Sequence, residues 1–255
     1  MTTALSADDR RRLAATFGSV ADLYERARPG YASAAIDWLL PPTARRVLDL
    51  AAGTGKLTAA LVDRGLDVVA VEPAPEMLDR LVTRLPTVDA RAGTAEHTGL
   101  PDNDVDAVLI AAALHWFERP AADHEIARVL RPGGTIGVFT NRRDTSVPWM
   151  HDLNELLTDR LVGWPRSPRS IESATFDPAL FTAPERTEFP NPRMVDADGL
   201  VDMIATRSYV IDLPEPKRTA LLDEVRHLAR THPDLVGQEN FELPYVTVTV
   251  RSRRK

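Results

Sequence analysis

The feature that most constrains the fold is a regular alternation of short apolar runs and longer amphipathic segments between residues 46 and 140. The apolar runs predict strands at 46–50, 67–72, 88–93, 105–110 and 135–140, and the amphipathic segments predict helices at 57–64, 75–85 and 121–130. Strands that alternate with helices of about ten residues form a mostly parallel sheet that helices cover on both faces. We therefore expect an α/β fold.

Further elements are expected on both sides of this region. Helices are predicted at about 6–17 and at 31–40 before it, and a helix at 149–162, a strand near 187, helices near 196–206 and 216–230 and a last strand at 245–250 after it. The segment 142–184 interrupts the alternation and contains the large apolar side chains of Trp149, Trp164, Phe176 and Phe181. These side chains favour a cap that lines a pocket, and an insertion packed on the core is the alternative.

The composition excludes several classes of protein. The 255 residues include no cysteine, which excludes disulfides, thiolate metal sites and thiol nucleophiles, and the six histidines show no ligand spacing, so we expect no metal. The net charge of −6 argues against a nucleic-acid partner, and the basic tail 251–255 is expected to be a solvated end. The opening residues 1–17 have charges where a signal peptide needs an apolar run, and no apolar run approaches the roughly 18 residues of a membrane span. We expect a cytoplasmic protein without a membrane partner.

A glycine-rich loop with the sequence DLAAGTGKL follows the first predicted strand, at 49–57. Ligands of open α/β sheets bind at the carboxyl ends of the strands, and Gly53 and Gly55 let the backbone approach a ligand closely. Glu72 ends the second strand, where an acid accepts hydrogen bonds from the two hydroxyls of a ribose. The loop and the acid together indicate an adenosine cofactor.

Two details indicate which adenosine cofactor the loop holds. The fingerprint of dinucleotide-binding loops has a third glycine, whose place Thr58 takes, and no P-loop pattern occurs. Asp49 disfavours a pyrophosphate and favours a ligand that carries an ammonium and a sulfonium. We therefore expect S-adenosylmethionine. An NAD-dependent oxidoreductase stays open as an alternative, although the chain has no Tyr-x-x-x-Lys pair.

The chain resembles the class I S-adenosylmethionine-dependent methyltransferases over about residues 15–140. The resemblance is carried by VLDLAAGTGKLTAAL at 47–61, VVAVEPAPEML at 68–78, RAGTAEHTGLPDNDVDAVLIAAALHWF at 91–117 and VLRPGGTIGVF at 129–139. The opening FGSVADLYERARPGY and the ending FELPYVTVTV are similar to bacterial members near the trans-aconitate methyltransferase branch. The resemblance implies a Rossmann-like, seven-stranded, mostly parallel sheet with an antiparallel last strand and helices on both faces.

The resemblance also implies a division of the chain and a set of site residues. It implies one methyltransferase domain over 1–255, with an N-terminal helical lid (1–40), a cofactor-binding core (41–141), a substrate-cap insertion (142–184) and C-terminal strands and helices that complete the sheet (185–255). One departure is Ala51, where the family usually has its first glycine. The implied cofactor residues are Asp49, Ala51, Gly53, Thr54 and Gly55 at the methionine end, Glu72 and Pro73 at the ribose, Met77, Ala95 and Glu96 at the adenine, Ala111 and Ala112 at the methionine backbone, and Tyr24, Arg28 and Tyr31 closing over the cofactor.

The expected reaction is methyl transfer to an O or N atom of a small molecule. The methyl group of a sulfonium is already activated, so the protein mainly aligns the acceptor with it. His115 is the candidate base, and loop packing that shapes the pocket wall is the alternative for His115-Trp116-Phe117. Arg142, Arg143, Arg166 and Arg169 suit a carboxylate acceptor, but solvated surface charge is the favoured interpretation. A cofactor-binding protein without turnover is a third possibility, because alignment leaves no catalytic signature.

Overall fold

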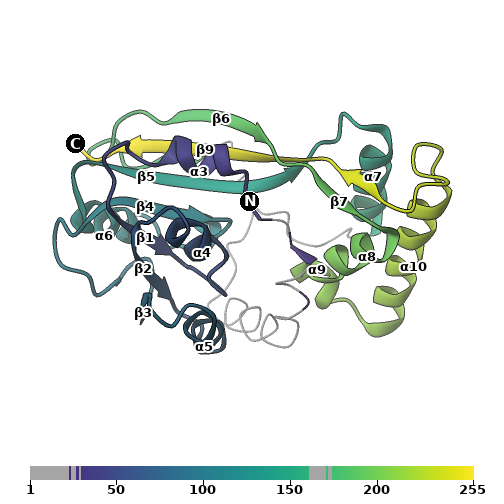
Figure 1. Ribbon diagram of the computed structural model, residues 1–255, viewed down its shortest axis with the longest axis horizontal. Helices are drawn as coiled ribbons and strands as arrows, with labels where there is room; N and C mark the ends of the chain where they lie inside the picture. Colours follow the sequence, from purple (N-terminus) through teal and green to yellow (C-terminus); the bar gives the residue numbers. More distant parts are fainter. Residues whose placement is uncertain (1–22, 24–26, 29, 161–170, 172–173) are drawn as a thin grey trace. The chain divides into compact units, whose positions relative to one another are not determined.

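The computed structural model describes residues 23, 27, 28, 30–160, 171 and 174–255 (Figure 1). The chain divides into two compact units, which we call the sheet unit and the helical unit. Among the described residues, the sheet unit comprises 30–141, 171, 174–189 and 247–255, and the helical unit comprises 23, 27, 28, 142–160 and 190–246. The predicted helix at 6–17 lies outside the described residues, as do Tyr24, Trp164, Arg166 and Arg169.

A seven-stranded sheet with the order β3-β2-β1-β4-β5-β9-β6 forms the centre of the sheet unit. Its strands are β1 (Arg46–Leu50), β2 (Asp67–Glu72), β3 (Asp89–Ala92), β4 (Val105–Ala111), β5 (Leu130–Arg143), β6 (Glu185–Pro190) and β9 (Tyr245–Arg253). The first five strands pair in parallel. Strand β9 is antiparallel to β5, because Gly133 N–H donates to Arg254 O and Arg254 N–H donates to Gly134 O. The expected α/β fold with an antiparallel last strand is confirmed.

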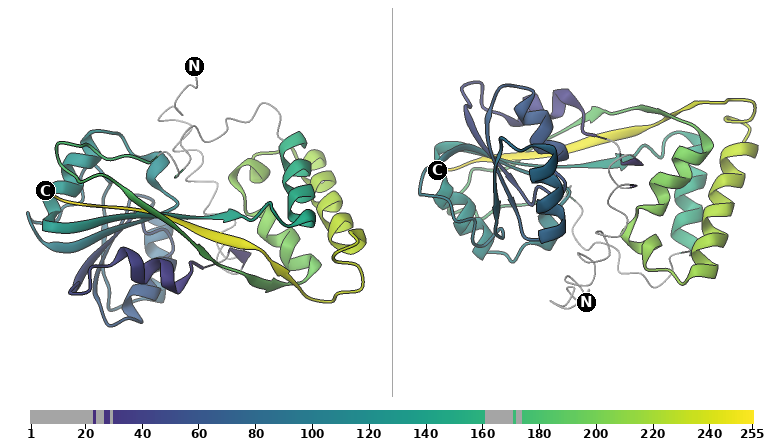
Figure 2. Two further views of the ribbon diagram at one scale, coloured as in Figure 1. Left: turned by 90° about the horizontal axis from the view of Figure 1, so that it is seen from above. Right: turned by 60° about the horizontal axis from the view of Figure 1, so that its bottom comes forward.

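Helices cover both faces of this sheet because alternate residues of each strand point to opposite sides. Helices α3 (Ser33–Leu39) and α4 (Lys56–Val62) bury Leu39 and Leu61 against Val47 and its neighbours on one face. Helix α6 (Ala121–Val129) buries Ile126 against Leu48 and its neighbours on the other face. Figure 2 shows α6 and the pair α3 and α4 on opposite sides of the sheet. Each fully buried side chain of this kind contributes about 1.5–3 kcal/mol.

The helical unit has its own apolar core. It contains α7 (Pro148–Arg160), α8 (Ala197–Ala205), α9 (Ser208–Ile211), α10 (Glu215–Thr231) and the antiparallel pair β7 (Arg193–Val195) and β8 (Phe241–Leu243). Trp149 meets Phe241 edge to face at 5.4 Å between ring centroids, and both side chains are buried. Asp196 caps α8, since its side chain accepts from Gly199 N–H at 2.6 Å. No helix of the described chain is both long and apolar enough to cross a membrane.

Several elements differ from the sequence expectations. Short elements such as β7, β8 and α9 were not predicted, because three or four residues leave too little periodicity to read. The segment 142–184 contributes to both units, with 142–160 in the helical unit and 174–184 in the sheet unit. Trp149 is buried in the core of the helical unit, and Phe176 and Phe181 are buried in the core of the sheet unit.

The basic tail is not a solvated end, contrary to the prediction. Arg251 stacks on Trp38 at 4.0 Å from the ring centroid, and its guanidinium donates to Trp38 O. Ser252 is buried, and the guanidinium of Arg254 donates to Leu130 O. The tail is ordered because Arg251, Ser252 and Arg253 belong to β9, which lies between β5 and β6. A count of charges alone cannot reveal such pairing.

Candidate functional site

The carboxyl ends of β1, β2 and β4 meet at one edge of the sheet unit. In the parallel register Asp49 of β1 lies opposite Ala70 of β2 and Leu109 of β4. Strands β1 and β4 are neighbours in space but not in sequence, so the strand order reverses between them. Open α/β sheets bind ligands at the carboxyl ends of the strands where the order reverses. The loops after β1 and β4 therefore lie at the expected ligand-binding edge.

Both of these loops contain left-handed backbone. In the loop after β1, φ is +60° at Ala51, +57° at Gly53 and +82° at Gly55, and in the loop after β4 φ is +56° at Ala112. Such a conformation is free for glycine, whereas it costs roughly 1–2 kcal/mol at alanine. A Cβ on Gly55 would lie 2.9 Å from Leu81 Cγ, so this position needs glycine for space as well. Backbone strain of this kind concentrates at ligand sites, which fits the place of Ala51 and Ala112.

Glu72 links the end of β2 to the glycine-rich loop. Its Oε2 accepts from Gly53 N–H at 2.8 Å, and its Oε1 accepts from Ala74 N–H at 2.9 Å. Glu72 is buried, and burial raises its pKa, while the hydrogen bonds from Ala74 and Gly53 oppose that rise. A carboxylate has about four acceptor positions, so each oxygen can still accept from a ligand.

Asp49 is the most unusual charged group of the site. It is 0% exposed, and its Oδ2 accepts from Thr58 Oγ1 at 2.6 Å, whereas its Oδ1 is buried without a hydrogen-bond partner among the described residues. Burial raises the pKa of Asp49 to about 7; the bond from Thr58 opposes this rise and the charge of Glu72 adds to it. A buried acceptor without a partner costs about 1–3 kcal/mol. The site therefore holds a half-satisfied carboxyl that a cationic donor would complete.

Sequence reasoning missed the role of Thr58. That residue was noted only because it replaces the third glycine of dinucleotide-binding loops. In the structure Thr58 is 0% exposed, lies in the first turn of α4 and fixes one oxygen of Asp49. A hydroxyl nine residues after an acid can be identified as its hydrogen-bond partner only when the fold of the strand, loop and helix between them is known.

The other predicted residues of the core take varied positions. Thr54 and Ala95 are buried, and Met77 is 9% exposed in the first turn of α5 (Pro75–Arg84). Pro73 is exposed directly after β2, and Ala111 ends β4. Helix α5 packs on β2 and β3, as a helix that follows β2 is expected to do. The roles of these residues toward a cofactor stay predictions.

Glu96 has a contact within the protein that the sequence did not indicate. Its Oε1 accepts from Glu118 N–H at 2.8 Å, which ties the loop at 93–98 to the loop after β4. His115 lies in that second loop, within the short helix η1 (Leu114–Trp116), and its ring is 4.6 Å from the Trp116 ring. Desolvation lowers the pKa of His115, although the residue keeps an exposed surface. A neutral imidazole at neutral pH follows.

The N-terminal residues expected to close over the cofactor fall in different units. Tyr31 belongs to the sheet unit and meets Phe139 edge to face at 4.5 Å between ring centroids. Gly30 O next to it accepts from Asn141 Nδ2 at 2.8 Å, so this part of the chain is fixed to the sheet. Arg28 belongs to the helical unit, where its guanidinium donates to Thr206. A closing role for Tyr31 and Arg28 stays a prediction.

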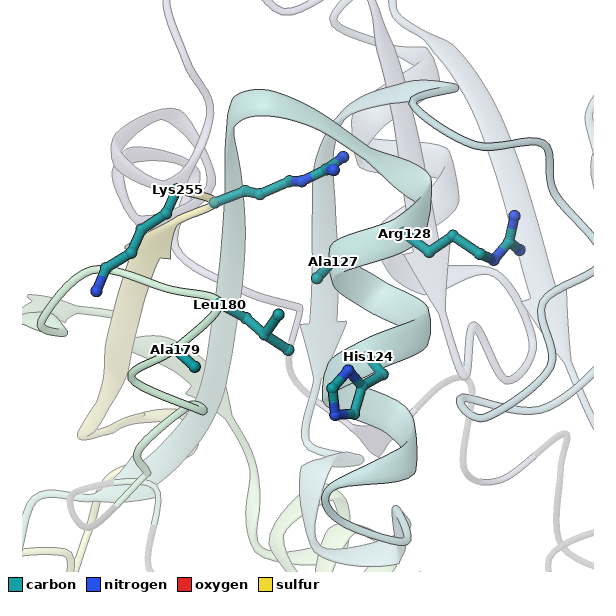
Figure 3. Close-up of a pocket in the computed structure, with 7 residues that line it drawn as sticks. His124, Ala127, Arg128, Ala179, Leu180 and Lys255 are labelled. Atoms are coloured by element: carbon teal, nitrogen blue, oxygen red, sulfur yellow. The ribbon is translucent and has the colours of Figure 1, made fainter.

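A separate open cavity of about 310 Å³ lies at the other end of the sheet unit. It is lined by residues of α6 and of the chain around Leu180 and Lys255, and α6 ends there, next to the amino end of β5. In Figure 3 the charged ends of Arg128 and Lys255 point away from each other. Polar groups do not converge in this cavity, so we assign it no ligand. Among the described residues, no group of three or more histidines and carboxylates is arranged to hold a metal.

The fold and the site together define a class of protein: an open α/β sheet with a glycine-rich loop and two buried carboxylates at its switch point. Residues 48–138 match the methyltransferase domain family. An uncharacterised methyltransferase of Mycobacterium tuberculosis is 48% identical over 95% of this chain and 97% of its own length. The chain belongs to the class I S-adenosylmethionine-dependent methyltransferases.

Solved structures agree with this assignment. A candidate type II methyltransferase from Anaeromyxobacter dehalogenans has a TM-score of 0.66 and 25% identity, covering 89% of this chain and 97% of its own. Phosphoethanolamine N-methyltransferase 2 of Haemonchus contortus, solved in complex with S-adenosylmethionine, has a TM-score of 0.53 and 15% identity, covering 92% of this chain and 57% of its own. At 15% identity the second likeness concerns the fold alone.

Proposed function

We propose that this protein binds S-adenosylmethionine at the β1–β2–β4 edge and transfers its methyl group to an O or N atom of a small molecule. One observation carries the proposal: Asp49 and Glu72, both buried, flank the loop at Gly53, and Asp49 Oδ1 has no hydrogen-bond partner in the part of the chain that the structure describes. Membership of the methyltransferase family supplies the reaction class, and the site residues supply the reason to expect this cofactor.

The residues present fit the cofactor. Each oxygen of Glu72 already accepts one backbone N–H, which fixes the carboxylate and leaves acceptor positions for the two ribose hydroxyls. Asp49 Oδ1 is a buried acceptor that would gain a charge-assisted hydrogen bond from the ammonium of the methionine end. A pyrophosphate would instead bring negative charge next to Asp49, which disfavours NAD.

The bound cofactor would supply an activated methyl group, and the protein would then have to align an acceptor atom with it. Alignment of this kind can lower a barrier by roughly 7–11 kcal/mol. His115 would help as a neutral hydrogen-bonding group rather than as an acid, because its lowered pKa keeps the ring unprotonated at neutral pH. Glu96 would hold the loop of His115 in place through its bond to Glu118 N–H.

A methyl-transfer screen tests the proposal. The full chain is incubated with S-adenosylmethionine labelled in its methyl group and with sets of small acids, phenols and amines. We expect label in at least one set and at least about tenfold less label in the same reactions with Glu72→Ala, at a cofactor concentration below the wild-type Kd. Hydride transfer from a member of these sets to NAD⁺, seen as formation of NADH with no labelled product, would favour the oxidoreductase alternative instead.

A further inference from the structure

The surroundings of Asp49 contain no charge that would balance an ionised carboxylate. Its neighbours in the parallel register, Ala70 on β2 and Leu109 on β4, are apolar, and helix α4 presents the neutral hydroxyl of Thr58. The charged group that acts on Asp49 is another acid, Glu72. Among the described residues, no arginine or lysine forms an ion pair with either acid. A buried carboxyl in such surroundings takes up a proton more readily than a carboxyl in water.

The hydrogen bonds around the two acids differ in a way that bears on their charge. Glu72 accepts one backbone N–H on each oxygen, from Gly53 at 2.8 Å and from Ala74 at 2.9 Å, and such donors favour the ionised form. Within the described chain, Asp49 accepts from Thr58 Oγ1 alone, and its Oδ1 is buried without a partner. A hydroxyl can donate to a carboxylate or accept from a carboxylic acid, so Thr58 suits both forms of Asp49. Asp49 is therefore the acid whose charge a ligand can change.

We propose that Asp49 is a neutral carboxylic acid in the cofactor-free protein below neutral pH, and that it releases its proton when the ammonium group of the cofactor binds beside it. Such a proton release rests on the proposed function and deepens it, because it is the event by which the site recognises the methionine end. The O–H bond of the acid breaks and the proton leaves to the solvent. The carboxylate that remains accepts a charge-assisted hydrogen bond from the ammonium, at the Oδ1 that has no partner within the described chain.

Proton release links the affinity for the cofactor to pH. Burial raises the pKa of Asp49 to about 7 in the free protein, and a bound ammonium lowers it, since an opposite charge favours the ionised form. Below about pH 7 the ligand must therefore displace a proton, and its affinity falls as the pH falls. At about pH 6.5 roughly 0.5–0.8 protons should leave per ligand bound, and the Kd should rise at least about fivefold from about pH 7.5 to about pH 5.5. The α-ammonium of the ligand, with an ordinary pKa of about 7.7–8.0, stays mostly charged at about pH 6.5.

Two ligands that differ in their amino-acid part test whether the ammonium triggers the release. The full chain is titrated by calorimetry at about pH 6.5 with S-adenosylhomocysteine, which carries the ammonium, and with 5′-methylthioadenosine, which lacks it. Each titration is repeated in two buffers of different ionisation enthalpy, because the difference between the two heats counts the protons released. We expect about 0.5–0.8 protons per S-adenosylhomocysteine and fewer than about 0.2 per 5′-methylthioadenosine. Equal release with the two ligands would overturn the inference.

Asp49→Asn then locates the proton. The amide keeps the size of the side chain and cannot titrate, so this variant should release fewer than about 0.2 protons per S-adenosylhomocysteine and lose most of the change in Kd between about pH 7.5 and about pH 5.5. Asp63→Asn is the matched control, because Asp63 is exposed at the end of α4; it should release protons as wild type does. Wild-type release in Asp49→Asn would overturn the assignment of the proton to Asp49. If Asp49→Asn does not fold, the two ligands and the wild-type Kd at the two pH values decide.

Failure of the proton release and failure of the proposed function give different results in the same titrations. Binding of S-adenosylhomocysteine without proton release, and with the same Kd at both pH values, would overturn the inference and leave the cofactor site standing. No binding of S-adenosylhomocysteine at either pH would contradict the proposed function and the inference together.

Discussion

Asp49→Asn should raise the free energy of unfolding of the cofactor-free protein and should weaken the binding of the cofactor. The buried carboxyl has a pKa of about 7, against 3.8 for an ordinary aspartate. Each pKa unit corresponds to about 1.36 kcal/mol, so ionised Asp49 lowers the free energy of unfolding by about 4 kcal/mol at about pH 8. The asparagine amide keeps the acceptor for Thr58 Oγ1 but buries an NH₂ group. The unmet hydrogen bonds of this group cost about 1–3 kcal/mol, which reduces the gain from removing the charge.

The pH dependence separates these two effects. The folded-state pKa is raised, so the unfolded chain binds fewer protons at this residue than the folded chain between about pH 4 and pH 7. Wild-type stability at this group therefore falls as the pH rises through that window and levels off above the folded pKa. The cost of the amide does not depend on pH. The gain from Asp49→Asn should be about 2 kcal/mol larger at about pH 8 than at about pH 5.5.

Urea unfolding of the cofactor-free protein at the two pH values measures this gain. Asp63→Asn is the matched control, because Asp63 is exposed at the end of α4. Exposed substitutions away from special features usually change stability by less than about 0.5 kcal/mol. A gain that is the same at both pH values would refute the reasoning, since Asp49 would then carry no destabilising charge that a cationic cofactor could relieve.

Three further predictions concern Ala51, His115 and the C-terminal tail. Ala51→Gly should leave the free energy of unfolding unchanged or raise it by up to about 1 kcal/mol, as measured by urea unfolding. Relief of the left-handed strain at φ +60° balances or outweighs the extra entropy that glycine gives the unfolded chain. His115→Asn should lower the methyl-transfer rate by at most about 20-fold without a new pH dependence between about pH 6 and 9, whereas loss of a general base costs about 10²–10⁴-fold. Deleting residues 252–255 should lower Tm by several degrees, because it removes buried Ser252 and the hydrogen bond from Arg254 to Leu130 O. An unchanged Tm would mean that the tail does not contribute to stability.

The periodic part of the chain was predictable because its elements are long enough to repeat. Strand β2 was expected at 67–72 and is found at Asp67–Glu72, and the helix expected at 75–85 is found at Pro75–Arg84. Proline at the helix start and an apolar run bounded by polar residues are local signals, and local signals survive folding when the tertiary structure agrees with them.

The site was predictable in outline and not in its contacts. Asp49, Gly53 and Glu72 could be named because strand ends and glycines are visible in the sequence, and the structure brings Gly53 and Glu72 together. The bond of Thr58 to Asp49 and that of Glu96 to Glu118 depend on how loops fold back, which has no periodic signature. The hydrogen bond from Arg28 to Thr206 joins residues that lie far apart in the sequence, so only the folded chain could reveal it.

The affinity of S-adenosylmethionine for wild type and for Glu72→Ala tests the central claim most directly. The exposed acid Glu76, on α5, provides the control variant Glu76→Ala. Calorimetry should give a micromolar Kd for wild type and for Glu76→Ala, negligible binding of NADH, and a loss of about 10- to 150-fold in Glu72→Ala, since bonds to a charged acceptor contribute about 1.5–3 kcal/mol. Equal affinity of Glu72→Ala and wild type, or tight binding of NADH, would contradict the assignment of this edge as the cofactor site.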